Sequence, residues 1–439
     1  MRMHIATINS IAVTATVALM AVTTAGYGAG FQISEQTVTG LGRAFAGSGV
    51  AGDDLSDMFY NPASMALHDE RRFQAGLSLL SIDSKFQNQG STQTLLGPAG
   101  FITIPTSGID DNGGEDAAVP NLYYVFPARG AVRYGISITA PFGLKTQYDS
   151  TWVGRYHALE SELKTIDVNP AVAFAVNDKV SIGGGISAQF ADATLSQAVF
   201  LGLGVPDGRA TITGDDTSIG FNLGVMVSTE NDARFGVSVR SKIKQEVEGN
   251  LDISGTPADG RFGAKATVDL PETVYAHGLI PLSSGWSLLG GARWTNWSRF
   301  DELRVMFDNG APDSVTDESW DDSLTLSIGL SYEPENSPWT WRFGLARDES
   351  PVPDAQHRTP RVPDSDRDWF TVGASYRSSD NVSIDFGFAH LEADDAKLNN
   401  TVNLVSAAPG LFTDTLVGEY ASNSVDILGI QIQVDFPAN

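Results

Sequence analysis

The 439-residue sequence contains no cysteine, has few basic residues and lacks a long apolar segment beyond its first 28 residues. Without cysteine, neither a disulfide framework nor a thiolate metal site can form. The 28 Lys and Arg residues against 53 Asp and Glu residues give a net charge of −25. This charge argues against a nucleic acid partner, because neutralising phosphates requires clustered basic side chains. The missing apolar segment excludes a later transmembrane helix, which would need about 20 such residues.

Motifs for catalysis and metal binding are also scarce. The six histidines show no i,i+2 or i,i+4 pairing, and the chain has no Gly-x-Ser-x-Gly nucleophile elbow. Residues 364–368 (DSDRD) suggest a calcium loop, but Trp369 and Ser375 stand where the glycine and the distal glutamate should be. We therefore expect no catalytic residue, no metal and no cofactor, and an external loop rich in ion pairs. A hydrolase whose Ser and His lie on different strands would carry no local signature and stays an alternative.

The N-terminus has the pattern of a secretory leader. Arg2 supplies positive charge, residues 8–22 form an apolar run, and Gly26 and Gly28 are small residues at the positions that a signal peptidase reads. The sequence therefore predicts a signal peptide over residues 1–28. A chain exported in this way can still span a membrane as a closed barrel, because closure satisfies all backbone polar groups between strands.

Alternation of apolar and polar residues with period two recurs along the chain. In residues 430–436 (IQIQVDF), for example, every second residue is apolar. We count fourteen such segments, and an even number is typical of a single-chain bacterial barrel. The segments are residues 73–87, 118–128, 130–141, 164–176, 179–200, 215–229, 233–252, 263–280, 284–308, 320–333, 339–348, 367–377, 381–391 and 417–436.

The connections between these segments fall into two classes. Short polar turns at 177–178, 230–232 and 379–381 are typical of periplasmic hairpins. The long polar stretches are expected to be external loops, and they comprise residues 88–117, 142–163, 201–214, 309–319, 349–366 and 392–416. Six tryptophans near expected strand ends suggest an aromatic girdle, with ordinary sheet packing as the alternative; they are Trp286, Trp294, Trp297, Trp339, Trp341 and Trp369. The sequence thus predicts an all-β fold, a 14-stranded antiparallel transmembrane barrel over residues 72–439.

Residues 29–71 differ from the rest because small and turn-forming residues dominate them. They contain residues 29–35 (AGFQISE), residues 40–47 (GLGRAFAG) and the tripeptide Asn61-Pro62-Ala63. No sustained apolar period is present, so this segment cannot build a core alone. The following strands have to hold it.

Further motifs occur in the expected barrel at residues 269–272 (DLPE), 294–298 (WTNWS), 348–353 (DESPVP) and 363–369 (PDSDRDW). In order and spacing these motifs and the N-terminal ones resemble the long-chain fatty acid transporters of the bacterial outer membrane, the FadL family, which includes aromatic hydrocarbon transporters. The resemblance implies that residues 29–71 form a hatch inside the barrel. It also implies that Asn61, Pro62 and Ala63 pack near an inward kink of the third strand, where a gap opens sideways.

Pro141 and Gly143 are the residues expected at this kink. Proline is excluded from paired central strands, and glycine often marks bulges and bends. A simple turn from strand to loop is the alternative at these two positions.

The expected ligand pocket departs from the family pattern. Fatty-acid-carrying relatives place basic residues where the substrate carboxylate binds, but Gln197 stands at one such position. Residues 311–322 contain no Lys or Arg where another base is expected. Either nearby cations replace them or the ligand is uncharged; the candidate cations are Arg155, Arg240 and Lys242. Phe31 in the hatch is expected to shift when the ligand is released.

These expectations describe a monomeric outer-membrane transporter for passive, diffusion-driven uptake of hydrophobic compounds, with long-chain fatty acids as the first candidate. Aromatic or alkane hydrocarbons are the alternative substrates, while a lipid hydrolase and an adhesive barrel are alternatives of other classes. Expected partners are the hydrophobic small molecule, outer-membrane lipid and lipopolysaccharide, without nucleic acid. Exit is expected sideways through the gap at Pro141 and Gly143.

Overall fold

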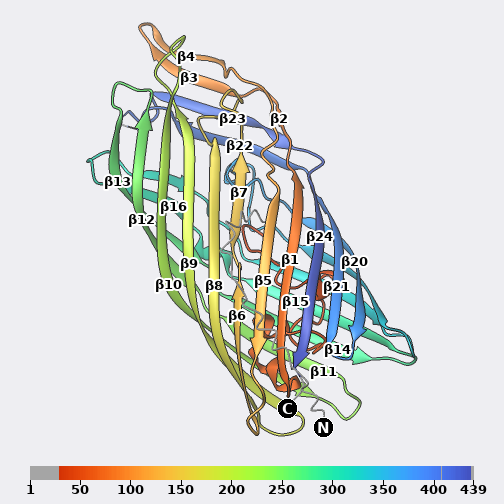
Figure 1. Cartoon of the computed structure of the whole chain (residues 1–439). Coiled ribbons are helices and arrows are strands. Elements are labelled where there is room, and N and C mark those ends of the chain that lie inside the picture. Colours follow the sequence, from red (N-terminus) through yellow and green to blue (C-terminus); the bar gives the residue numbers. More distant parts are fainter. Residues whose placement is uncertain (1–28, 407, 437–439) are drawn as a thin grey trace, which may run out of the picture.

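The computed structural model describes residues 29–406 and 408–436, and the predicted signal peptide 1–28 lies outside them. The described residues form a closed antiparallel barrel (Figure 1). The barrel closes because β1 pairs with β24 along all of its 13 residues and with β5 on its other side. Closure gives every wall strand a partner on both sides, which is the condition for strands to cross a membrane.

Fourteen strands form the wall, which confirms the predicted fold class. Nine of them are continuous: β1 (Arg71–Asp83), β5 (Ala117–Val125), β8 (Glu160–Ala175), β9 (Val180–Val199), β10 (Gly208–Ser228), β19 (Trp339–Asp348), β20 (Arg367–Ser379), β21 (Val382–Ala393) and β24 (Ser424–Phe436). Five consist of two segments: β6 (Val132–Thr139) with β7 (Gly143–Gln147), β11 (Arg234–Arg240) with β12 (Ile243–Ser254), β13 (Gly260–Leu270) with β14 (Thr273–Pro281), β15 (Trp286–Thr295) with β16 (Glu302–Phe307), and β17 (Ser314–Asp317) with β18 (Ser323–Tyr332).

A second sheet covers one end of the barrel, called the loop end below (Figure 1). Its five strands are β2 (Phe86–Asn88), β3 (Thr92–Gly97), β4 (Gly100–Pro105), β22 (Ala396–Asn403) and β23 (Phe412–Tyr420). Residues 88–117 and 392–416 were expected to be loops, and the last barrel strand begins at residue 424 rather than 417. The sequence pattern missed this sheet because β23 pairs with β2 and β3, more than 300 residues away.

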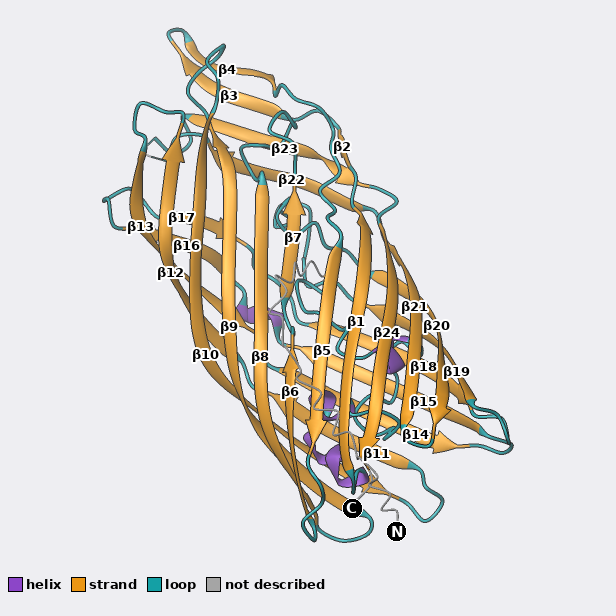
Figure 2. Ribbon diagram, viewed as in Figure 1, coloured by secondary structure: helices purple, strands orange, loops and turns teal. Residues whose placement is uncertain are grey.

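The opposite end of the barrel, called the turn end, carries the short connections and the end of β24 (Figure 2). Along the wall the alternation has the predicted orientation. On β24, Ile430 is 53% exposed on the outside while Gln431 and Gln433 are buried inside. On β6, Tyr134 and Ile138 are exposed while Arg133 is buried.

The tryptophans follow the predicted girdle only in part. Trp294 and Trp341 are exposed on the outer surface, but Trp297 and Trp369 are buried inside the barrel. Trp369 lies at an inward-facing position of β20, and Trp297 starts the 3₁₀ turn η2 (Trp297–Arg299), which interrupts the alternation between β15 and β16. The girdle assignment is therefore wrong for these two residues.

The segment before β1 lies inside the barrel and ends at residue 70, because β1 begins at Arg71. It contains α1 (Val38–Leu41), α2 (Asp57–Tyr60) and the 3₁₀ helix η1 (Pro62–Leu67), drawn in purple in Figure 2. These elements are short, and no helix among the described residues could cross a membrane. The segment touches the wall closely: a Cβ on Gly42 would lie 2.6 Å from the Gly373 Cα, so both positions need glycine.

We predict that Ile430→Arg destabilises the protein in lipid by about 2–4 kcal/mol, the cost of an arginine near the middle of the lipid-facing wall. The matched control is Ile102→Arg in β4, where the isoleucine is similarly exposed (45%) but lies in the loop-end sheet. The control should change the free energy of unfolding by no more than about 0.5 kcal/mol. Urea unfolding of the protein in vesicles measures both, and equal costs would contradict the assigned membrane face.

Candidate functional site: the hatch and the opening in the wall

The first interruption of strand pairing in the wall lies at the third strand, where residues 140–142 separate β6 from β7. β5 pairs with β6 only from Leu122 to Val125, although residues 117–121 continue the strand and pair with β1. Over residues 117–121 the ladder toward the third strand is therefore open. Pro141 lies within the break.

The N-terminus of the hatch supplies hydrogen-bond partners at this break. The Ile33 N–H donates to the Pro141 carbonyl (2.9 Å), and the Gly143 N–H donates to the Phe31 carbonyl (2.9 Å). These two bonds have the pattern of an antiparallel strand pair, with the hatch on the inner side. The hatch thus replaces the missing part of the wall ladder.

Two side chains complete the pairing of the break. Gln36 Nε2 donates to the Ala140 carbonyl (2.8 Å). The Phe142 N–H donates to Thr165 Oγ1 (3.0 Å), and Thr165 Oγ1 donates to the Phe142 carbonyl (2.6 Å). These backbone polar groups of residues 140–143 therefore have hydrogen-bond partners outside β5, as buried backbone groups require.

Phe31 sits at the centre of a group of aromatic and aliphatic side chains above the hatch. Its ring lies 4.6 to 6.2 Å, centroid to centroid, from those of Trp297, Phe300, Trp320 and Phe142. The same group, called the aromatic cluster below, also contains Leu144, Ile243, Leu270, Val352 and Val362. Because Phe31 fills its centre, a hydrophobic molecule can occupy the cluster only by displacing that ring.

Gly30 fixes the position of the hatch N-terminus against the cluster. Its φ of +65° is left-handed, and a Cβ at this position would lie 2.6 Å from Trp320 Cζ3. The Gly30 N–H donates to Asp364 Oδ2 (2.9 Å), and Arg367 Nη2 pairs with Asp364 Oδ1 (2.5 Å). The segment that superficially suggested a calcium loop therefore anchors the hatch through an ion-paired aspartate.

The Asn-Pro-Ala motif occupies a different place from the break. Asn61 Oδ1 accepts from the Ala63 N–H (3.0 Å), and Asn61 Nδ2 donates to the Val225 carbonyl of β10 (3.0 Å). Pro62 opens η1, where its missing N–H costs nothing. The hydrogen bonds of the described chain thus join this motif to β9 and β10, whereas residues 31–36 meet the third strand. The sequence-predicted gate residues lie in two separate places.

Arg155 is held within the loop-end structure. Its Nε pairs with Asp207 Oδ2 (2.8 Å), and its guanidinium lies 4.5 Å from the centre of the Tyr156 ring. A hydrogen bond to the Ser107 carbonyl fixes it further. These contacts use its charge to join three loop segments.

Arg240 and Lys242 lie on opposite sides of the wall strand that they share. Arg240 stacks on the Phe59 ring of the hatch (4.3 Å to the centroid), and its Nη2 lies 3.6 Å from Asp167 Oδ1. Lys242 is exposed and forms no ion pair with a carboxylate of the described residues. The structure therefore places only Arg240 of these two against the hatch.

Gln197 meets a cation that the sequence pattern did not single out. Arg361 Nη2 donates to Gln197 Oε1 (3.0 Å), and Arg361 Nη1 donates to Ser161 Oγ (3.0 Å). Among the described residues no carboxylate forms an ion pair with Arg361. The next residue, Val362, belongs to the aromatic cluster, so the backbone of Arg361 adjoins the edge of that cluster. The feature of the sequence that could have pointed to Arg361 is its position in the Pro-rich loop 349–366.

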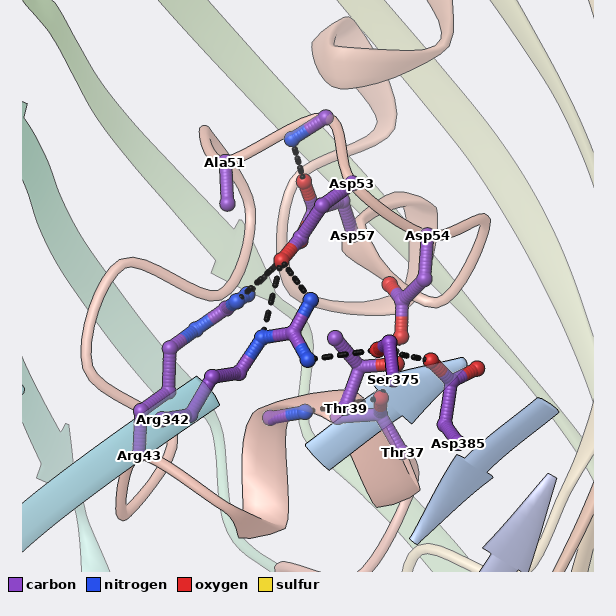
Figure 3. Close-up of polar contacts among 12 residues, drawn as sticks. Thr37, Thr39, Arg43, Ala51, Asp53, Asp54, Asp57, Arg342, Ser375 and Asp385 are labelled. Carbon is purple, nitrogen blue, oxygen red and sulfur yellow. Dashed lines mark hydrogen bonds and ion pairs between the residues drawn. The ribbon is translucent and has the colours of Figure 1, made fainter. Parts of the chain in front are cut away.

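A polar network fastens the other side of the hatch to the wall (Figure 3). Asp53 accepts from Arg43 of the hatch (2.5 Å) and from Arg342 of β19 (3.0 Å). Arg342 also donates to Ser375, which in turn donates to Asp385 of β21. The network therefore links the hatch to three neighbouring wall strands through buried arginines.

Asp53, Asp54 and Asp57 have oxygen atoms within 4.8 Å of one another, a grouping that could in principle bind a cation. Their oxygens already accept from protein donors. Asp57, for example, accepts from the Gly49 and Gly52 N–H groups at 2.8 and 2.5 Å. Through these hydrogen bonds the three carboxylates stabilise the fold of the hatch.

Comparison with known proteins decides the family. The profile described as outer membrane protein transport protein (OMPP1/FadL/TodX) matches residues 19–436. The chain belongs to this family. A long-chain fatty acid transport protein of Escherichia coli O6:H1 is 29% identical over 417 residues, which cover 87% of this chain and 91% of the relative.

Solved structures agree on the fold. A Pseudomonas aeruginosa FadL homologue superposes with a TM-score of 0.82 at 24% identity, covering 93% of this chain and all of the other. The toluene transporter TbuX of Ralstonia pickettii gives a TM-score of 0.64 at 19% identity, covering 91% and 100%.

The family assignment confirms several expectations from the sequence. This FadL-family chain is a transporter of hydrophobic compounds in the outer membrane and is not an enzyme. In such barrels the short turns face the periplasm and the longer loops face the exterior. The loop end is therefore extracellular and the turn end periplasmic.

We predict that Asp53→Asn loosens the hatch while the barrel stays folded. An amide cannot neutralise the charges of two arginines. The substitution should therefore lower the free energy that holds the hatch to the wall by about 2 kcal/mol. This is less than the loss expected for a fully buried ion pair, because Asp53 is 29% exposed. Planar-bilayer recordings should show higher ion conductance. The control Asp426→Asn, which breaks an exposed pair with His390, should conduct like the unaltered protein. Equal conductance of all three proteins would contradict the anchoring role.

Proposed function

We propose that this protein carries long-chain fatty acids across the outer membrane passively, down their concentration gradient. Two features support an acid with a long apolar chain over a neutral hydrocarbon. The aromatic cluster offers an apolar site, where desolvation favours binding by about 25 cal/mol per Å² of buried apolar area. The cation at its edge, Arg361, has no carboxylate partner among the described residues.

The electrostatic setting of Arg361 carries this proposal. Arg361 belongs to an extracellular connection, and burial lowers its pKa to about 10, so it remains charged at neutral pH. Its neighbours Gln197 and Ser161 are neutral and leave that charge uncompensated. A carboxylate that forms a charge-assisted hydrogen bond with it would compensate the charge.

Glu318 is a carboxyl group of the protein that can compete for this charge. Burial raises the pKa of this carboxyl, in the connection between β17 and β18, to about 8, and it interacts electrostatically with Arg361 without forming an ion pair. At pH 7 the carboxyl is therefore mostly protonated. As pH rises through 8 it ionises and should compete with a bound acid for Arg361.

The route follows from the positions of Phe31 and the break at Pro141. A fatty acid that enters the aromatic cluster displaces the Phe31 ring. Movement of Phe31 also withdraws its carbonyl from the Gly143 N–H, which weakens the pairing that seals the third strand. We propose that the fatty acid then leaves sideways into the membrane, in contact with outer-membrane lipid and lipopolysaccharide. Because the barrel closes within one chain, a monomer is sufficient.

We predict that Arg361→Gln weakens binding of palmitate about 10- to 100-fold, the loss of one or more charged hydrogen bonds worth about 1.5–3 kcal/mol. Binding of methyl palmitate should change little, since the ester carries no charge. Isothermal titration of detergent-purified protein at pH 7 measures both ligands. Arg361→Lys should retain part of the preference for the acid.

The matched control is Arg358→Gln, which removes an arginine of the same loop that bonds to the Asp364 and Lys397 carbonyls. It should leave the preference for acid over ester unchanged. Raising the pH to 9 should weaken palmitate binding in the unaltered protein but not in Glu318→Gln. Equal affinity for acid and ester in the unaltered protein would reject the fatty acid and favour a neutral hydrocarbon.

We predict that replacing both Pro141 and Gly143 with valine slows palmitate uptake by cells, because β-branched residues favour regular pairing and fill the opening. Assembly should be intact, as judged by heat-modifiable mobility in detergent gels. The control is the double substitution Ala171→Val and Ala173→Val on β8, whose ladders with β6 and β9 are continuous at these positions. Normal uptake by the folded Pro141 and Gly143 variant would remove the lateral route at the third strand.

A further inference from the structure

The wall contains a second long interruption of strand pairing, between β10 and the strand formed by β11 and β12. β10 pairs with β12 from Arg209 to Asp215 and with β11 from Asn222 onward. Between these ladders β10 has six residues (216–221), and the facing strand has seven (241–247). The unequal lengths prevent a regular ladder from continuing through this region, called the β10–β12 break below.

Side chains replace the backbone ladder in the middle of this break. The Glu246 N–H donates to Asp216 Oδ2 (2.8 Å), and Ser218 Oγ donates to the Lys244 carbonyl (2.7 Å). Such bonds satisfy the backbone but leave the strands less tightly joined than a ladder, because each depends on one rotatable side chain. The break is therefore a weakly paired region of the wall.

The outer surface of the break is apolar. Ile219 is 74% exposed and Phe221 is 52% exposed, and Leu223 continues the same outward-facing row of β10 toward the turn end. Above them, outward-facing Thr217 is polar and exposed. The break therefore lies at the extracellular edge of the apolar band, where the chains of outer-leaflet molecules begin.

A narrow cavity of about 20 Å³ lies behind the break. Gln32 of the hatch and Phe142 of the third strand bound it on one side, and Phe221 and Ser241 of the break bound it on the other. One space therefore touches the hatch, the opening at the third strand and the β10–β12 break.

Ile243 closes the break from the inside. Its side chain belongs to the aromatic cluster and lies over Gly220, where an added Cβ would be 2.7 Å from its Cγ1 and Cδ1 atoms. Gly220 has no side chain to separate Ile243 from the break. A rotation of this single side chain would join the aromatic cluster to the outer surface.

We propose that the β10–β12 break is a second membrane-facing passage, through which the apolar chain of a single-chain lipid acid moves between the barrel interior and the outer leaflet. The cavity is about the size of one water molecule, so an apolar chain enters the passage only when Ile243 moves aside. Arg240 on the inner side and exposed Lys242 on the outer side suit an acidic head group. The identity of the cargo rests on the proposed function, whereas the passage itself does not.

Shortening the facing strand by one residue tests the passage directly. Removing Lys242 leaves six residues on each side of the break, and pairing residue for residue then keeps inward-facing Gly220 opposite inward-facing Ile243. In the ladders of β11 with β14 and β12 with β13, Lys242 faces Pro271. Deleting both Lys242 and Pro271 therefore closes the break and keeps those two ladders in register. The matched control, Lys242→Gln with Pro271→Ala, changes the same positions but keeps the lengths.

The readout is labelling of a single cysteine by a long-chain alkyl maleimide dissolved in the bilayer of reconstituted vesicles, since the natural chain contains no cysteine. Ile243→Cys reports access through the break. Ala389→Cys is the reference, because Ala389 is buried and its ladders with β20 and β24 are continuous. We expect rapid labelling at 243 and slow labelling at 389. We also expect labelling at 243 to fall in the deletion variant and to persist in the length-preserving control.

Labelling at 243 should also persist when Pro141 and Gly143 are both valine, which separates this passage from the first one. Labelling at 243 no faster than at 389, or lost only when the third strand is closed, would overturn the proposal. If the deletion variant does not fold, the passage is judged from the labelling rates at 243 and 389 in the variant with valine at 141 and 143. Absence of palmitate uptake by the unaltered protein would reject the proposed cargo, while the labelling would still judge the passage.

Discussion

The whole structure depends on one constraint: a backbone polar group that faces lipid or a dry interior must find a hydrogen-bond partner within the chain. The closed ladder of fourteen strands meets it nearly everywhere. At the third strand the ladder fails, and the hatch takes over through the pairs of Ile33 with Pro141 and Phe31 with Gly143. The hatch is thus a part of the wall as well as a plug in the lumen.

The two interruptions of the wall meet this constraint in different ways. At the third strand the partners come mainly from another segment, so opening that site requires the hatch to move. At the β10–β12 break the partners come from side chains of the break itself, including Asp216 and Ser218. That site can rearrange while the hatch stays in place. The network of Asp53 with Arg43 and Arg342 is consistent with this difference between the two sites, because it holds the hatch to β19 and not to β10 or β12.

Properties with a local cause could be predicted from the sequence. Alternation on each strand gave the orientation of Ile430 and Gln431, and proline chemistry pointed to Pro141 as a break in the third strand. Properties that depend on distant partners could not be predicted. Arg361 reaches Gln197 across 164 residues, so no spacing rule connects them. Trp297 was misassigned because the turn η2 reverses the inside–outside alternation that was assumed to continue.

Phe31 connects ligand occupancy with the state of the wall because it acts through two different groups. Its ring fills the aromatic cluster, and its carbonyl accepts the Gly143 N–H that seals the third strand. A ligand that takes the place of the ring moves the same residue that holds the seal. In the proposed mechanism no external energy source is therefore needed, since binding in the cluster is favoured by desolvation and itself weakens the barrier to exit. Gly30, with its left-handed φ and its bond to Asp364, fixes the chain on the N-terminal side of this residue.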